Sequence, residues 1–183
     1  MARWRSDPGH AWLILSDEEN ARVPQAHRLP EYEEDSAWSI AVLALPSLLE
    51  GPAFKHLDTT AKRAQVLEHA RETCRNWHPD AYTAITGEPL TPADSRVLAE
   101  RQFHTDHAQD WVVISAVGDW HTDVPQGFVL GTATLGGNRN SAARKDFLIP
   151  QDTYHARSQF GYVITDDDLL VVPTEHLSEM AYA

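Results

Sequence analysis

The chain has 183 residues, and its 15 lysines and arginines against 27 aspartates and glutamates give a net charge of −12 at pH 7. Direct binding to nucleic acid or to an anionic membrane needs a basic footprint, so this composition argues against both. Hydrophobic residues make up 42% and charged residues 23%, as is typical of folded globular proteins. We expect residues 1–183 to form a single α+β domain.

The cysteine content and the apolar runs indicate where in the cell the protein is located. Cys74 is the only cysteine, which excludes an intrachain disulfide and fits a reducing compartment. The N-terminal residues lack the apolar stretch of a secretory signal. The longest apolar run, residues 40–45, is too short to span a bilayer. We therefore expect a cytoplasmic protein without membrane contact.

The first elements along the chain are a strand and an apolar segment. Residues 11–15 predict a short strand that is entered through Pro8-Gly9, and Ser16 caps a short acidic helix after it. Residues 37–45 are apolar almost all round, which fits either a buried helix or a buried strand. Three alanines and the acids before the segment favour the helix.

Three more helices are predicted before residue 110. Thr59 caps a long helix that runs to about Asn76, with one apolar face at helical spacing formed by Ala64, Leu67, Ala70, Cys74 and Trp77. A short helix begins at Pro79 and closes at Gly87. A further helix opens at Thr91-Pro92 and runs to about Ala108.

The second half of the sequence is rich in β-branched residues. It predicts strands at residues 111–117, 127–135, 147–149, 160–164 and 169–172, with a short helix within 150–159. Helices followed by strands are typical of an α+β fold. We expect N-terminal helices packed on one face of a mainly antiparallel β-sheet of four to six strands.

Two groups of residues could support catalysis. His104 and His107 share a helix face, and His121 follows in the next loop, so together they could bind a metal ion. With ten histidines in the chain such pairs arise by chance, and we predict no bound metal and no cofactor. Cys74 lies near His69 and His78, but its place on an apolar face predicts inert packing.

The only net basic segment is residues 136–145, a glycine-rich turn that carries Arg139, Arg144 and Lys145 and no acid. Such a turn can bind an anion through its cations and amides. The alternative interpretation is a hairpin loop that the charged residues keep hydrated.

Acidic residues form two clusters, and exposed aromatic residues are candidate anchors. The first cluster contains Glu31, Glu33, Glu34 and Asp35, and the second contains Asp166, Asp167 and Asp168. Each cluster is interpreted either as ordinary hydrated surface or as a negative surface that faces a basic partner. Trp12, Trp38, Trp77 and Trp111 are expected in the core, whereas Trp120 has polar neighbours and could anchor an interface.

Several short segments in this order resemble an uncharacterised domain family that is encoded on bacterial plasmids, prophages and phages. The resemblance covers roughly residues 9–165 and rests on residues 9–10, 15–16, 20–24, 32–38, 75–82, 86–88, 107–116, 133–137, 147–150 and 160–164. It implies a mobile-element setting and no site residues.

Charge and setting together favour a binding protein over an enzyme. The leading hypothesis is an accessory protein that binds, and could inhibit, a host nucleic-acid-directed defence system of the anti-restriction or anti-CRISPR type. Its partner would be a host protein or a basic nucleic-acid-processing complex, without direct contact to nucleic acid. The alternatives are a small metal-dependent or hydrolytic enzyme near His104, His107 and His121, or a structural module that forms homodimers.

Overall fold

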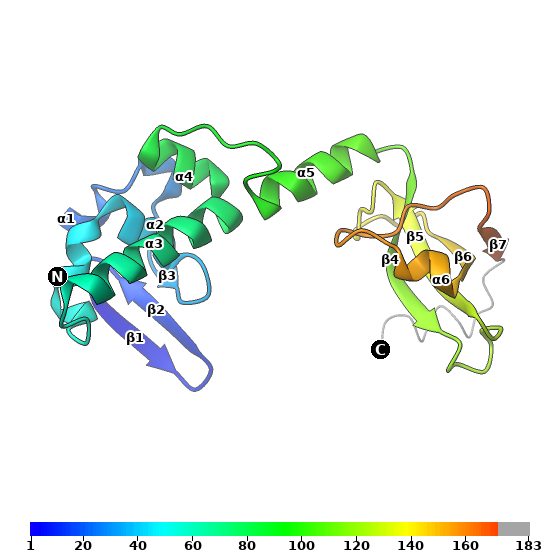
Figure 1. The fold of residues 1–183 in the computed structure, drawn as a ribbon, viewed down its shortest axis with the longest axis horizontal. Coiled ribbons are helices and arrows are strands. Elements are labelled where there is room, and N and C mark those ends of the chain that lie inside the picture. The colour runs from blue at the N-terminus through cyan, green and yellow to red at the C-terminus, as the bar shows by residue number, and fades with distance from the viewer. Residues whose placement is uncertain (172–183) are drawn as a thin grey trace. The chain divides into compact units, whose positions relative to one another are not determined.

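A computed structural model describes residues 1–171, which divide into two compact units (Figure 1). Unit 1 comprises residues 1–99, and the described part of unit 2 comprises residues 100–171. Each unit has its own antiparallel sheet and its own buried apolar residues. That residues 1–183 act as a single domain stays a prediction, and unfolding experiments can test it.

Unit 1 combines a three-stranded sheet of order β1-β2-β3 with a set of helices. Its elements are β1 (Arg3–Asp7), β2 (His10–Ile14), α1 (Asp17–Asn20), β3 (Tyr32–Glu33), α2 (Trp38–Ala44), α3 (Thr60–Trp77) and α4 (Pro79–Thr86), with 3₁₀ turns at Gln25–His27, Pro46–Glu50 and Pro52–Phe54.

The core of unit 1 lies between the sheet and the helices. Leu13 of β2 is paired with Tyr32 of β3, and both side chains are fully buried. Val42 of α2 and Cys74 of α3 are also fully buried and belong to the same cluster. Because α2 is apolar around most of its circumference, nearly all of it is buried, and the preference for a helix at residues 37–45 is confirmed.

The strand β1 was not expected, because its mostly polar sequence shows no apolar alternation. In the structure its polar side chains are exposed. It forms a hairpin with β2, and the turn contains Gly9 with a φ of 138°. Gly9 N–H donates to the carbonyl oxygen of Asp7 at 2.8 Å. A glycine adopts this backbone conformation without the steric cost that other residues incur.

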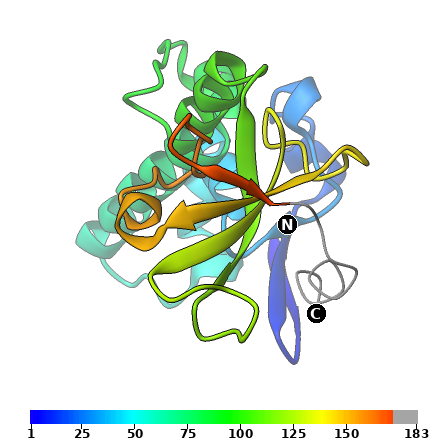
Figure 2. The ribbon, with the colours of Figure 1, turned by 90° about the vertical axis from the view of Figure 1, so that its right-hand side faces the viewer.

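Unit 2 contains a four-stranded antiparallel sheet of order β4-β5-β6-β7. The elements of this part of the chain are α5 (Arg96–Asp106), which contains the boundary between the units, β4 (Trp111–Gly118), β5 (Phe128–Leu135), β6 (Lys145–Pro150), α6 (Gln151–His155) and β7 (Leu169–Val171). Figure 2 shows α6 following directly from β6. No helix within residues 1–171 is both long and apolar enough to cross a membrane.

The α+β class is confirmed, but the strands form two sheets and not one sheet of four to six strands. Residues 160–164, which were expected to form a strand, are not one of the strands of the sheet of unit 2. They run beside β4 and form one isolated bridge with it, between Val112 and Val163, while Gly161 forms another with Ser158. The helix expected from Thr91-Pro92 begins later, at Arg96, because Asp94 accepts hydrogen bonds from the backbone and the hydroxyl of Thr91 and holds a turn there.

Candidate functional site

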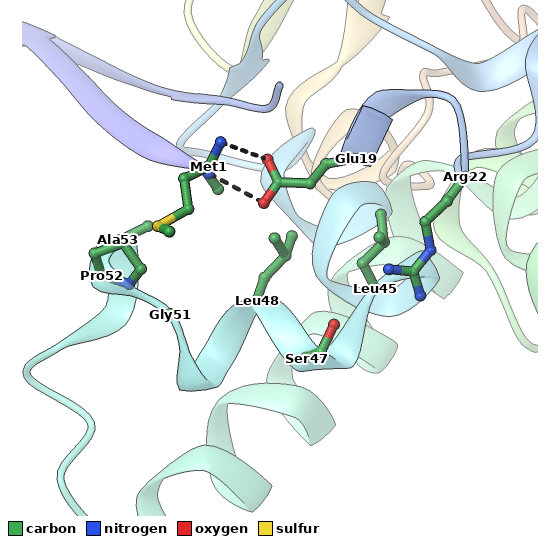
Figure 3. A pocket seen from close by; sticks show the side chains of 10 residues that line it. Met1, Glu19, Arg22, Leu45, Ser47, Leu48, Gly51, Pro52 and Ala53 are labelled. Carbon is green, nitrogen blue, oxygen red and sulfur yellow. Dashed lines mark hydrogen bonds and ion pairs between the residues drawn. The ribbon is translucent and has the colours of Figure 1, made fainter. Parts of the chain in front are cut away.

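A small cavity of about 90 Å³ lies in unit 1 at the N-terminal residues (Figure 3). Its walls include the apolar side chains of Leu45 and Leu48. The Met1 ammonium lies 3.7 Å from the Glu19 carboxylate, which also accepts a hydrogen bond from Ala2 N–H at 3.2 Å. Because the two charges satisfy each other and the space is small, this cavity is a weak candidate for ligand binding.

The first acidic cluster begins one residue before β3 and continues into the turn that follows this strand, at one edge of the sheet of unit 1. Glu31 is neutralised, because its carboxylate lies 2.6 Å from the guanidinium of Arg5. Glu33 accepts hydrogen bonds from the backbone N–H of Asp35 at 2.8 Å and of Ser36 at 3.4 Å. This carboxylate is thereby held in place, while Glu34 and Asp35 are exposed.

His10 joins this cluster through the sheet. Trp12 of β2 is paired with Glu33 of β3, and Glu34 N–H donates to the carbonyl oxygen of Ala11 at 2.9 Å. The register places ligand-type atoms of His10, Glu33 and Glu34 within 4.8 Å of one another. We refer to His10, Glu33, Glu34 and Asp35 as the acidic edge.

One imidazole and two carboxylates are donors that divalent metals accept. The acidic edge is therefore the place in residues 1–171 where three such groups come together. The same groups can equally receive the cation of a lysine or an arginine from a partner. The prediction that the protein holds no metal stays a prediction, which a measurement of metal content tests.

The second acidic cluster has two different roles. Asp166 and Asp167 are exposed. Asp168 accepts hydrogen bonds from Thr165 N–H at 2.8 Å and from the Tyr162 hydroxyl at 3.2 Å, so it fixes the turn before β7. Only the first two aspartates thus present a carboxylate that is not already engaged in this turn.

Trp120 lies in the loop after β4, and 77% of it is exposed, in agreement with the expectation of a surface position. A Cβ on Gly118 would lie 3.0 Å from its indole ring, so the ring rests against the end of β4. The absence of a side chain at Gly118 thus leaves the space in which this exposed ring lies.

The histidines of the enzyme hypothesis have separate partners. His104 contacts the carbonyl oxygen of Gly136 at 2.9 Å, and His107 contacts the carboxylate of Asp110 at 2.8 Å. His121 accepts a hydrogen bond from the backbone of Asp123 at 3.3 Å. Within residues 1–171 these three histidines do not form a metal-ligating group.

Cys74 is fully buried, as expected, and burial raises the pKa of its thiol to about 11. The nearby His78 contacts the hydroxyl of Ser36 at 3.0 Å. Trp77 was expected on the same buried face, and that prediction is wrong, because 50% of it is exposed. It lies at the last position of α3, where the guanidinium of Arg96 is 5.5 Å from its ring.

The three basic residues of segment 136–145 are not equivalent. Arg144 donates hydrogen bonds to the carbonyl oxygens of Ser141 and Arg139, and Lys145 Nζ lies 4.4 Å from the ring of Trp111. Arg139 instead lines a cavity of about 200 Å³ together with Arg157, a residue that sequence reasoning missed. Arg139 and Arg157 are 18 positions apart, so no local pattern signals this pairing.

Comparison with known proteins gives one family. A family model described as "Domain of unknown function (DUF7007)" matches residues 3–108, which is more than half of the chain. No curated protein matches the sequence, and no solved structure matches the fold.

Proposed function

We propose a binding role for this chain, which belongs to the DUF7007 family, a domain family of unknown function. In this proposal it is an accessory protein of a mobile genetic element. It binds a basic surface of a host nucleic-acid-directed defence system, of the anti-restriction or anti-CRISPR type, and thereby inhibits it. The proposal rests on the chain's own surface and charge, since the family itself supplies no activity.

The observation that carries the proposal is the acidic edge. Glu34 and Asp35 are exposed beside a carboxylate, Glu33, that two backbone N–H groups hold in place. A cluster of like charges at a solvent-exposed edge is retained at a cost in self-repulsion, which an arriving cation relieves. A partner that presents lysine or arginine side chains fits this surface.

The overall charge supports the same class of partner. With a net charge of −12 the chain attracts basic proteins over a distance and repels nucleic acid. A nucleic-acid-processing complex presents the basic groove that would be attracted. The exposed Asp166 and Asp167 in unit 2 add to this field, and Trp120 offers an aromatic anchor of the kind found at interfaces.

The test is a capture experiment with matched charge variants. Wild-type protein, a Glu34→Gln/Asp35→Asn variant and a control Glu68→Gln/Glu72→Gln variant are used as bait in lysate of the host bacterium. Both variants change the net charge equally, and all four residues are exposed. The captured partner is then purified, and its association rate with each protein is measured.

We expect the acidic-edge variant to associate about threefold to tenfold more slowly than the control, because exposed charges act mainly on the association rate. Raising the salt from about 0.05 M to about 0.3 M should remove the difference, since screening shortens the range of these charges. Equal rates for the two variants, or a captured partner without a basic surface, would show that the acidic edge is not the binding surface.

A further inference from the structure

A second candidate site lies in unit 2, in the cavity of about 200 Å³ beside β4. One wall is the segment Val113 to Ser115, where the pairing of β4 with β5 shifts register. Such an irregularity in a strand redirects the side chains around it and is common beside functional sites. The opposite wall is the segment from Arg157 to Tyr162.

The cavity exists because the second wall pairs with β4 only in part. Val113 N–H donates to the carbonyl oxygen of Tyr162 at 2.9 Å, and Ile164 N–H donates to that of Trp111 at 2.8 Å. A Cβ on Gly161 would lie 2.9 Å from a methyl group of Val112, so only glycine allows this close approach. These two hydrogen bonds lie at Trp111 and Val113, and the cavity lies beyond them, beside Ser115.

The lining of this cavity is positively charged, whereas the whole chain is negatively charged. In a chain of net charge −12, the lining contains Arg139 and Arg157 and no aspartate or glutamate. Arg157 is held in place, because its guanidinium lies 4.4 Å from the ring of Tyr154 and donates to the carbonyl oxygen of that residue. Most of its N–H donors are left for a ligand, since a guanidinium has five.

The hydroxyl of Ser115 provides an independent observation. Its Oγ atom is buried and has no hydrogen-bond partner among residues 1–171, while the residue itself lines the cavity. A buried hydroxyl without a partner is costly, and it is usually explained by a missing water, ion or ligand. Ser158, by contrast, is already bonded, to the carbonyl oxygen of Gly161 and to Phe160 N–H.

We propose that this cavity of unit 2 binds a phosphoryl group through the guanidinium groups of Arg139 and Arg157, with the Ser115 hydroxyl turning from its buried position toward the ligand to donate a further hydrogen bond. Three terminal oxygens offer acceptors for two planar guanidinium groups and one hydroxyl at the same time, whereas a carboxylate offers only two oxygens. The phosphoryl group belongs either to free phosphate or to a small phosphate monoester, whose organic part would lie against Tyr154 or Phe160.

Isothermal titration calorimetry of the full chain tests this proposal with inorganic phosphate, phenyl phosphate and benzoate as ligands. We expect inorganic phosphate or phenyl phosphate, or both, to bind, with benzoate at least about tenfold weaker. Tighter binding of phenyl phosphate would identify the monoester as the source, and equal binding would identify free phosphate.

Variants distinguish binding in the cavity from nonspecific attraction of phosphate to positive charge. Arg139→Gln and Arg157→Gln should each weaken phosphate binding about tenfold or more, since each removes a hydrogen bond to a charged group. The control Lys145→Gln removes the same charge from the same basic segment, outside the cavity lining, and should leave the affinity unchanged. Ser115→Ala should weaken binding while raising the melting temperature of the free protein.

The proposal is overturned if neither phosphate ligand binds, if benzoate binds as tightly as phenyl phosphate, or if Lys145→Gln weakens binding as much as Arg139→Gln. The melting temperature of each variant, measured without ligand, shows whether it is folded. If Ser115→Ala melts at or above the temperature of the wild type, a loss of affinity in this variant is not caused by misfolding.

Discussion

At the residue scale, burial determines the chemistry of Cys74. Its thiol is fully buried, and its pKa is raised from 9.0 to about 11 by desolvation. Since the thiolate is the reactive form, this shift alone lowers the reactive fraction by about a hundredfold at any pH below both values. A buried cysteine of this kind contributes packing and no nucleophile.

We therefore expect a thiol reagent such as Ellman's reagent to label Cys74 at least about a hundredfold more slowly in the native protein than in urea. Absorbance of the released thiolate measures both rates near pH 8. The native rate should rise when denaturant populates open states, because access then limits the reaction. Rapid labelling in the absence of denaturant would place Cys74 at the surface and contradict the packing of α3.

At the element scale, two threonines of β5 provide a matched comparison. Thr132 lies opposite Asp146 of β6 and donates a hydrogen bond to its buried carboxylate at 2.7 Å. Thr134 lies two positions further on the same strand, and its buried hydroxyl has no hydrogen-bond partner among residues 1–171. The two residues have the same shape and differ in what their hydroxyl groups do.

Replacing Thr132 by valine should lower the free energy of unfolding by about 1–3 kcal/mol, because it leaves the buried Asp146 carboxylate without this donor. Replacing Thr134 by valine should leave stability unchanged or raise it by up to about 1 kcal/mol, because it removes a hydroxyl that has lost its hydration. Urea unfolding followed by circular dichroism measures both. Equal losses for the two variants would refute the assigned roles.

The long helices were predictable because their apolar spacing is local information, as in α3. The sheets were harder to predict, since Trp4 is the only apolar residue of β1 and the pairing of strands depends on residues far apart in sequence. The candidate sites divide in the same way. Glu34 and Asp35 are recognisable from local charge, whereas the contribution of His10 follows from the register of β2 and β3.

Four residues have roles in the structure that the local sequence does not predict. Glu31 and Asp168 belong to acidic runs, but one is neutralised by Arg5 and the other caps a turn. Neither partner can be deduced from the run itself, because such contacts depend on tertiary structure. Arg157 and Ser115 were missed because they meet Arg139 only through the fold of unit 2.

At the scale of the whole molecule, the buried apolar residues form separate clusters in the two units. One cluster lies entirely within residues 1–99 and includes Leu13, Tyr32 and Cys74. The clusters of unit 2 are formed by residues from β4 onward, such as Val113 and Ile149. The DUF7007 match, residues 3–108, covers unit 1 from residue 3 onward and all of α5.

We expect residues 1–108 to fold without the rest of the chain, because a domain needs its own core and unit 1 has one. The fragment should unfold cooperatively in urea, with a midpoint close to that of unit 1 within the full chain. Labelling of Cys74 reports on unit 1 in both proteins, since this is the only cysteine. If the midpoint of the fragment falls far below that of the full chain, residues 109–183 stabilise unit 1, and the single domain expected from the sequence is the better description.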